Sequence, residues 1–116
     1  MQANLGDAMM RLSGLLMLTL AVIAPVGPSC ADEAAMALGK KVFLEISSPQ
    51  CALCHTLADA GASGAVGPVL DELKPTADRV RTAVTKGIGP MPPNSSLTRE
   101  QVEAVALYVS TVTGAK

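Results

Sequence analysis

Residues 51–55 of this 116-residue chain read Cys51-Ala52-Leu53-Cys54-His55. On a helix, side chains at positions i, i+3 and i+4 lie on one face, so Cys51, Cys54 and His55 would converge on one side of a single turn. Two thiols placed in this way can form thioether bonds to one macrocycle, while the adjacent imidazole reaches the iron at its centre. Because C-x-x-C-H is the attachment pattern of c-type haem, the stretch predicts one haem bound covalently through Cys51 and Cys54.

The same cysteines have two other uses, which stay open at this point. A bare C-x-x-C can be a thiol–disulfide redox pair at a helix N-terminus. Such a pair would require a surrounding βαβ unit, and the sequence has no convincing strand pattern. A structural zinc site takes four Cys or His ligands, and beyond the N-terminal segment only Cys51, Cys54 and His55 are available. Chance occurrence is the remaining alternative. We favour haem because no other use needs all three residues at once.

The N-terminal segment, residues 1–31, has the pattern of a secretory signal peptide. Arg11 gives a weakly positive start, an apolar run follows over 12–26, and small residues follow over 27–31. The run is short for a membrane-spanning helix and ends in a small-residue break. We therefore expect an exported, periplasmic protein with no membrane span in its mature form. An uncleaved anchor is the alternative.

The expected signal peptidase site lies after Ala31, with Ser29 and Ala31 at the −3 and −1 positions. Cleavage there removes Cys30 and leaves two cysteines, both in the C-x-x-C-H stretch. A lipid attached to Cys30 is a third alternative, although Gly27 and Pro28 make a poor lipid-attachment sequence.

Residues 32–116 are expected to form one small domain. Without Arg11 and Asp7 the formal charge remains −1, and there is no basic run, which argues against nucleic acid as a partner. Phe43 and Tyr108 are the only aromatic residues. Because a domain of this size buries only a marginally sufficient amount of apolar surface on folding, a buried haem would supply core volume that the side chains lack.

Three segments repeat apolar residues at helical spacing, so we expect an all-α domain. The first runs over 33–46 and is ended by Ser-Ser-Pro, and the second opens at Pro75-Thr76 and closes at Gly87. The third runs from Thr98 towards the C-terminus and opens with Thr98-x-x-Gln101, which can form a capping box.

Two loops between these helices carry candidate haem contacts. The loop 59–68 holds three glycines, which let the backbone lie close against a flat cofactor: Gly61, Gly64 and Gly67. Pro68 follows them, and its carbonyl oxygen is available to accept the other ring N–H of His55, a bond that orients a metal-bound imidazole. The loop 87–96 places Met91 between prolines that hold the chain extended, so its thioether is presented from a stiff segment.

The C-x-x-C-H stretch, Gly-Pro-Val-Leu at 67–70, a late Met-Pro and flanking terminal helices together resemble a class I monohaem cytochrome c over essentially the whole of 32–116. In that family the first helix carries a Gly…Phe pattern that crosses an aromatic residue on the last helix. Gly39, Phe43 and Tyr108 match this pattern. The resemblance therefore implies crossed N- and C-terminal helices around one covalently bound haem c.

The resemblance also implies roles for individual residues. The two cysteines would hold the haem, His55 would be the proximal iron ligand, and Met91 would be the distal iron ligand. Pro68 would supply the carbonyl partner of His55. After signal removal only Met36 competes with Met91 as a thioether, and its place on the apolar stripe of the first helix favours a core role.

A narrower resemblance concerns the partner. The stretches 49–57, 66–68 and 70–75 resemble the cytochrome subunit of bacterial sulfite dehydrogenases, in which a molybdenum subunit oxidises sulfite and passes single electrons to a small haem protein. This resemblance implies a molybdenum sulfite dehydrogenase as electron donor, and another cytochrome or an oxidase as acceptor.

The expected function is outer-sphere electron transfer. A His/Met iron has both axial positions filled, so no substrate binds the metal and the chain is a carrier, not an enzyme. One alternative is a general soluble shuttle to a terminal oxidase. Two others are a thiol-redox module that uses Cys51 and Cys54, and a haem sensor or peroxidase with an open iron site. A visible spectrum separates these classes.

Overall fold

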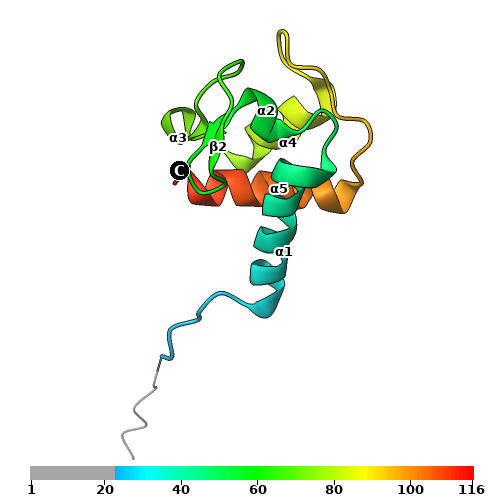
Figure 1. The fold of residues 1–116 in the computed structure, drawn as a ribbon. Helices are drawn as coiled ribbons and strands as arrows, with labels where there is room; N and C mark the ends of the chain where they lie inside the picture. Colours follow the sequence, from blue (N-terminus) through cyan, green and yellow to red (C-terminus); the bar gives the residue numbers. More distant parts are fainter. Residues whose placement is uncertain (1–22) are drawn as a thin grey trace, which may run out of the picture.

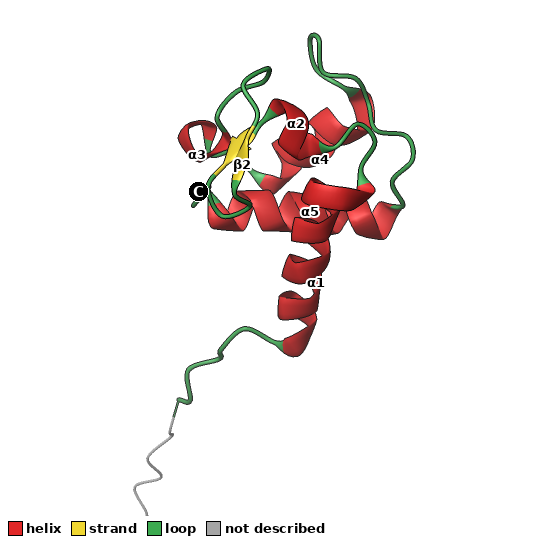
Figure 2. Ribbon diagram, in the orientation of Figure 1, coloured by secondary structure: helices red, strands yellow, loops and turns green. Residues whose placement is uncertain are grey.

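The computed structural model describes residues 23–116, and Figure 1 shows a helical body from which α1 projects. The helices are α1 (Cys30–Lys41), a π-helical turn directly after it (Val42–Ile46), α2 (Cys51–Cys54), α3 (Leu70–Leu73), α4 (Ala77–Lys86) and α5 (Arg99–Val112). Two short strands, β1 (Thr56–Leu57) and β2 (Ala62–Ser63), pair antiparallel. Figure 2 shows how little of the described chain is strand, and the all-α prediction is confirmed.

The predicted signal peptide lies mostly outside the described residues. Within them, Ser29 caps the start of α1: its Oγ accepts from the Asp32 N–H at 3.4 Å, and the Asp32 carboxylate accepts from the Ser29 N–H at 3.3 Å. The expected cut after Ala31 therefore falls inside the first turn of α1. Over residues 23–116, none of the helices has the length and apolar character needed to cross a membrane.

α1 and α5 cross at Gly39, and this crossing organises the fold. A Cβ on Gly39 would overlap the carbonyl oxygen of Ala104 and lie 2.5 Å from the Cβ of Tyr108, so only glycine lets the two backbones approach this closely. One turn later, Phe43 packs edge-to-face on Tyr108, with ring centroids 6.3 Å apart and an interplanar angle of 64°. Both rings are almost fully buried. The predicted crossing of the N- and C-terminal helices is confirmed.

α5 starts at the capping box that the sequence predicted. Thr98 Oγ1 accepts from the Gln101 N–H at 3.2 Å, and Gln101 Oε1 accepts from the Thr98 N–H at 2.9 Å. The two bonds satisfy donors that a helix N-terminus otherwise leaves without partners. Behind the cap, Val102, Val105 and Val109 lie in the core as one buried stripe.

α4 packs beside α5 and also begins and ends where the sequence indicates. Thr76 Oγ1 accepts from the Arg79 N–H at 3.4 Å, and Gly87 follows the last residue with φ +73°, a conformation that L side chains rarely adopt. Arg81 donates to both carboxylate oxygens of Glu103 on α5, at 2.8 and 2.7 Å. The ion pair is largely exposed, so we attribute the α4–α5 contact mainly to buried apolar side chains.

Two features near the C-x-x-C-H stretch differ from the sequence expectation. The helix expected over 33–46 ends in a π-helical turn, Val42–Ile46, which the Ser47 N–H closes by donating to the Val42 carbonyl at 3.1 Å. The second difference is α3, which the apolar pattern of the sequence does not predict. A single helical turn is too short for apolar periodicity to reveal it.

Candidate haem site

α2 is a single helical turn that carries the two cysteines. The buried Ser47 supports its start, because Ser47 Oγ accepts from the Cys51 N–H at 3.2 Å and lies 3.3 Å from Cys51 Sγ. The His55 N–H donates to the Cys51 carbonyl at 3.0 Å, but the backbone of His55 is already extended, with φ −113° and ψ 140°. The cysteines therefore share one turn, as expected, whereas the histidine leaves the helix and is oriented by the loop that follows.

The ring of His55 contacts Pro68, the residue predicted to orient it. His55 Nδ1 lies 2.9 Å from the carbonyl oxygen of Pro68. Because a carbonyl oxygen can only accept, Nδ1 carries the hydrogen in this contact, and in the neutral imidazole Nε2 then keeps its lone pair. Nε2 is then the nitrogen available to a metal. The iron-ligand role of His55 itself stays a prediction.

The backbone of residues 64–67 lies directly on the C-x-x-C-H stretch. A Cβ on Gly67 would lie 2.5 Å from His55 Cε1 and 2.8 Å from His55 Nδ1, and one on Gly64 would lie 2.6 Å from the carbonyl carbon of Cys54. The Gly67 N–H also donates to the Cys54 carbonyl at 2.7 Å. Gly61 differs, because it has φ +61° and open space around its Cα. Glycines 64 and 67 are thus required by close approach to the stretch itself.

The loop before these glycines is tied to the helix crossing through Asp59. Tyr108 donates its hydroxyl hydrogen to the Asp59 carboxylate at 2.5 Å, and Lys40 Nζ donates to the Asp59 carbonyl and carboxylate at 2.7 and 3.1 Å. The Tyr108 and Lys40 bonds lower the pKa of Asp59. Burial, together with the neighbouring carboxylate, raises the pKa of Tyr108. Sequence reasoning missed this anchor, although a buried tyrosine hydroxyl signals that a partner must exist.

Met91 lies at the end of a tight turn in the loop after α4. Ile88 and Met91 exchange both backbone hydrogen bonds, at 3.0 and 2.9 Å, across Gly89 and Pro90. Met91 is partly buried and packs against the core, and Met36 is also partly buried against the same core. Burial does not separate the two methionines. The distal-ligand role of Met91 therefore stays a prediction, and it rests on the position of its loop.

The residues present fit a covalently bound haem. Cys51 and Cys54 form no disulfide, and they lie three positions apart in one turn, beside an imidazole with an available Nε2. Burial raises the pKa of the Cys51 thiol, whereas a thiol-redox pair works through a thiolate of lowered pKa. In the part of the chain that the structure describes, no three His, Cys, Asp or Glu side chains come together as a metal site.

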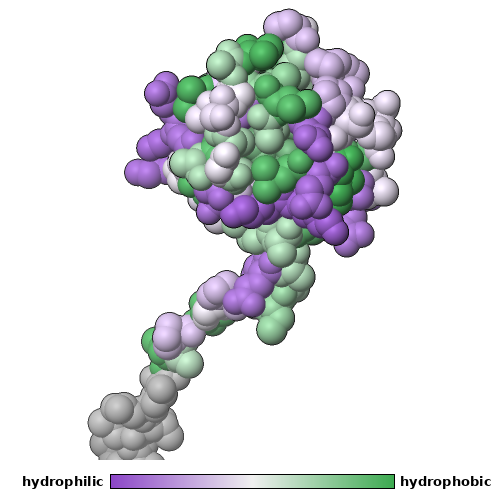
Figure 3. Space-filling model, viewed as in Figure 1, coloured by the Kyte–Doolittle hydropathy of each residue, from purple (hydrophilic) through white to green (hydrophobic). Residues whose placement is uncertain are grey.

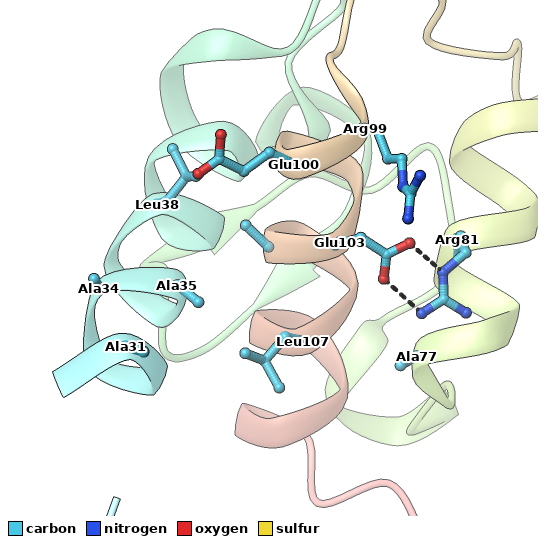
Figure 4. Close-up of a pocket in the computed structure, with 11 residues that line it drawn as sticks. Ala31, Ala34, Ala35, Leu38, Ala77, Arg81, Arg99, Glu100, Glu103 and Leu107 are labelled. Atoms are coloured by element: carbon cyan, nitrogen blue, oxygen red, sulfur yellow. Dashed lines mark hydrogen bonds and ion pairs between the residues drawn. The ribbon is translucent and has the colours of Figure 1, made fainter. Parts of the chain in front are cut away.

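An open hollow on the described surface lies away from these residues. It is an open groove of about 760 Å³ between α1, α4 and α5, and Figure 4 shows its lining. Alanines, Leu38 and Leu107 form its apolar wall, and the Arg81–Glu103 ion pair borders it. None of the predicted haem-site residues lines the groove.

The chain is similar to known proteins over most of its length. Residues 34–109 match a family model described as cytochrome C oxidase, cbb3-type, subunit III. The chain is also similar to the crystal structure of the c-type cytochrome SorU from Sinorhizobium meliloti, with 71% identity and a TM-score of 0.69, covering 72% of this chain and 95% of SorU. No curated protein matches the chain. The range matched by the family model contains the C-x-x-C-H stretch, Pro68 and Met91.

Proposed function

The chain belongs to the cytochrome c family and is an electron carrier rather than an enzyme in itself, and from this premise we propose that it carries single electrons in the periplasm through one haem. Cys51 and Cys54 hold the haem covalently, His55 and Met91 ligate the iron, and the carbonyl of Pro68 orients His55. The observation that carries this proposal is the contact at 2.9 Å between His55 Nδ1 and Pro68. It leaves Nε2 as the metal-binding nitrogen beside two thiols in one helical turn.

The residues around His55 prepare it for this role. Haem, when bound, supplies a one-electron iron couple whose potential depends on axial ligands, hydrogen bonding to those ligands and burial. The Pro68 carbonyl holds the proton on Nδ1 and makes the imidazole a stronger donor through Nε2. The backbone of Gly67 lies against the ring and restrains its rotation. Together these contacts fix both the tautomer and the orientation of the imidazole before iron binds.

Met91 completes the ligand set in this proposal. A soft thioether favours ferrous iron, and His/Met ligation raises the reduction potential. The turn that joins Ile88 to Met91 by two backbone hydrogen bonds restrains the loop. This restraint lowers the conformational entropy lost when the sulfur is fixed on iron. With both axial positions filled, the chain passes electrons without binding a substrate at the metal.

We propose a molybdenum sulfite dehydrogenase as the electron donor, and another cytochrome or an oxidase as the acceptor. The support is the resemblance of stretches 49–57, 66–68 and 70–75 to the cytochrome subunit of such dehydrogenases, together with the similarity to SorU. The family model that matches is named for an oxidase subunit. A general shuttle to a terminal oxidase is therefore the second candidate.

Stopped-flow absorption distinguishes these candidates. The oxidised protein is mixed with sulfite and the sulfite dehydrogenase of the same organism, and an unrelated soluble c-type cytochrome serves as the control acceptor. If this dehydrogenase is the cognate donor, it should reduce this protein faster than it reduces the control cytochrome. Equal rates for both acceptors would favour the general shuttle.

Mass spectrometry of the mature protein tests the periplasmic part of the proposal. We expect an N-terminus at Asp32 and the added mass of one haem. A diacylglycerol on Cys30 would instead place the protein at a membrane surface.

A further inference from the structure

Three stretches around the haem site contain no Asp, Glu, Lys or Arg: residues 46–58, 60–70 and 87–98. We call the surface that they form the neutral face. All the charged residues of the described chain lie outside these stretches. Asp59 separates the first two stretches, but its carboxylate accepts hydrogen bonds from Tyr108 and Lys40.

The neutral face exposes large apolar side chains beside the two cysteines. Leu53, inside the C-x-x-C-H stretch, is 62% exposed, and Val66 is 83% exposed. The two belong to one surface, because the Gly67 N–H, next to Val66, donates to the carbonyl of Cys54, next to Leu53, at 2.7 Å. Ile88 in the third stretch is 63% exposed, and it lies at the border, beside Asp78 and Arg79 of α4.

The figures place these parts at one end of the molecule. In Figure 1, α2, the loop after β2 and the loop after α4 all lie above α5, whereas the N-terminal half of α1 points away below it. Figure 3 shows the strongest purple in the lower and left parts of the body, and an upper end that is green to pale lilac. On the face drawn in Figure 3, the upper end formed by these loops therefore carries few strongly hydrophilic residues.

We propose that the neutral face is the surface on which the redox partner docks, and that the partner presents an uncharged, apolar surface to it. This inference rests on the proposed function, because the cysteines that hold the haem lie in the first stretch of this face, on either side of Leu53. A charged partner surface would lose water here without meeting an opposite charge, which is unfavourable. An apolar surface gains from covering Leu53 and Val66. The contact is small and short-lived, as expected for electron transfer.

This docking mode makes a kinetic prediction. Association steered by charge is fast at low salt and slows steeply as ions screen the charges. Association through a neutral face has a weak dependence, since the three stretches carry no charges and both signs of charge, Asp78 and Arg79, lie together at the border. The rate of electron transfer should then be nearly constant over a wide range of ionic strength.

Electron self-exchange of the full haem-loaded protein tests the inference directly. One electron passes from a ferrous molecule to a ferric molecule, so products equal reactants, and a second copy of the chain supplies a partner with a known neutral face. Exchange broadening of haem proton resonances gives the rate in mixtures of the two oxidation states. We expect the wild-type rate to change less than about threefold between low and high salt.

Substitutions locate the contact. Leu53→Lys and Val66→Lys place like charges opposite each other in the encounter of two copies, and each should slow exchange at least about tenfold at low salt, with recovery at high salt. Thr111→Lys, on the exposed side of α5, adds the same charge elsewhere and is the matched control. It should leave the rate within about twofold of wild type.

The haem spectrum and the reduction potential of each variant separate this inference from the proposed function. A wild-type protein without a c-type haem spectrum would overturn both. An intact spectrum and potential, combined with a wild-type rate in Leu53→Lys and Val66→Lys, would overturn the neutral docking face alone. Equal slowing by Thr111→Lys, or a strongly salt-dependent wild-type rate, would also overturn it.

Discussion

Replacing Gly67 by alanine tests the geometry of the His55 ring. The new Cβ would lie 2.5 Å from Cε1 and 2.8 Å from Nδ1 of the imidazole, where ordinary contact begins at 3.4 Å. The ring must therefore retreat by roughly 1 Å, given the steepness of van der Waals repulsion. Gly67 does not have a positive φ, so the alanine backbone itself carries no strain. The effect of the substitution is then confined to the ring.

A displacement of this size also breaks the bond to Pro68. The contact of 2.9 Å between Nδ1 and the carbonyl oxygen would lengthen past hydrogen-bonding distance. Losing it costs about 0.5–1.5 kcal/mol, and the overpacking adds about 1–3 kcal/mol. In a domain of this size that loss lowers the Tm of the haem protein by roughly 10 °C or more.

The assay combines a thermal melt with visible spectroscopy and potentiometry of the haem-loaded protein. Gly67→Ala should lower the Tm, shift the potential and increase binding of exogenous ligands such as imidazole. Ala65→Ser is the matched control, because it adds one heavy atom to an exposed position of the same loop. If Gly67→Ala keeps the Tm, spectrum and potential of wild type, the ring is not held as the structure shows.

The remaining predictions concern the crossing, the loop anchor and the thioether. Gly39→Ala places a Cβ against the backbone of α5, so calorimetry should show the free energy of unfolding lowered by about 1–3 kcal/mol. The control Ala37→Ser, on the exposed side of α1, should lower it by less than about 1 kcal/mol. Because the folded state lowers the pKa of Asp59, its contribution is present above the ordinary value of 3.8 and is lost as the pH falls through the lowered value. Asp59→Asn should therefore flatten the decline of Tm in acid, and an unchanged decline would contradict the role of this anchor. Met91→Ala should lower the reduction potential markedly and open the iron to exogenous ligands, while Met36→Ala should cost only packing stability; the reverse pattern in potentiometry would reassign the ligand.

The long helices could be predicted from the sequence because their signals are local. Apolar spacing and the Thr98–Gln101 capping box lie within a few residues of each other, and the structure shows both. The crossing of α1 and α5 was predicted through the resemblance carried by Gly39, Phe43 and Tyr108. Its physical cause, the absence of a Cβ at Gly39, appears only when the two backbones are brought together.

Features that depend on distant contacts could not be predicted in this way. The bond between Tyr108 and Asp59 joins residues 49 positions apart, and nothing near either residue specifies the other. The extended backbone of His55 depends on the loop that receives its ring. The sequence contains the three uncharged stretches of the neutral face. Only the fold shows that the first two stretches meet, where the Gly67 N–H donates to the Cys54 carbonyl.

A potentiometric titration of the purified mature protein, followed by visible absorption, shows whether the chain carries one covalently bound, His/Met-ligated haem. We expect a single one-electron transition between low-spin ferric and ferrous c-type spectra, at a potential raised by His/Met ligation. Alkaline pyridine should release no haem from the chain, because Cys51 and Cys54 hold it covalently. A protein without a Soret band would carry no haem, and a high-spin ferric iron that binds added ligands freely would contradict ligation by His55 and Met91.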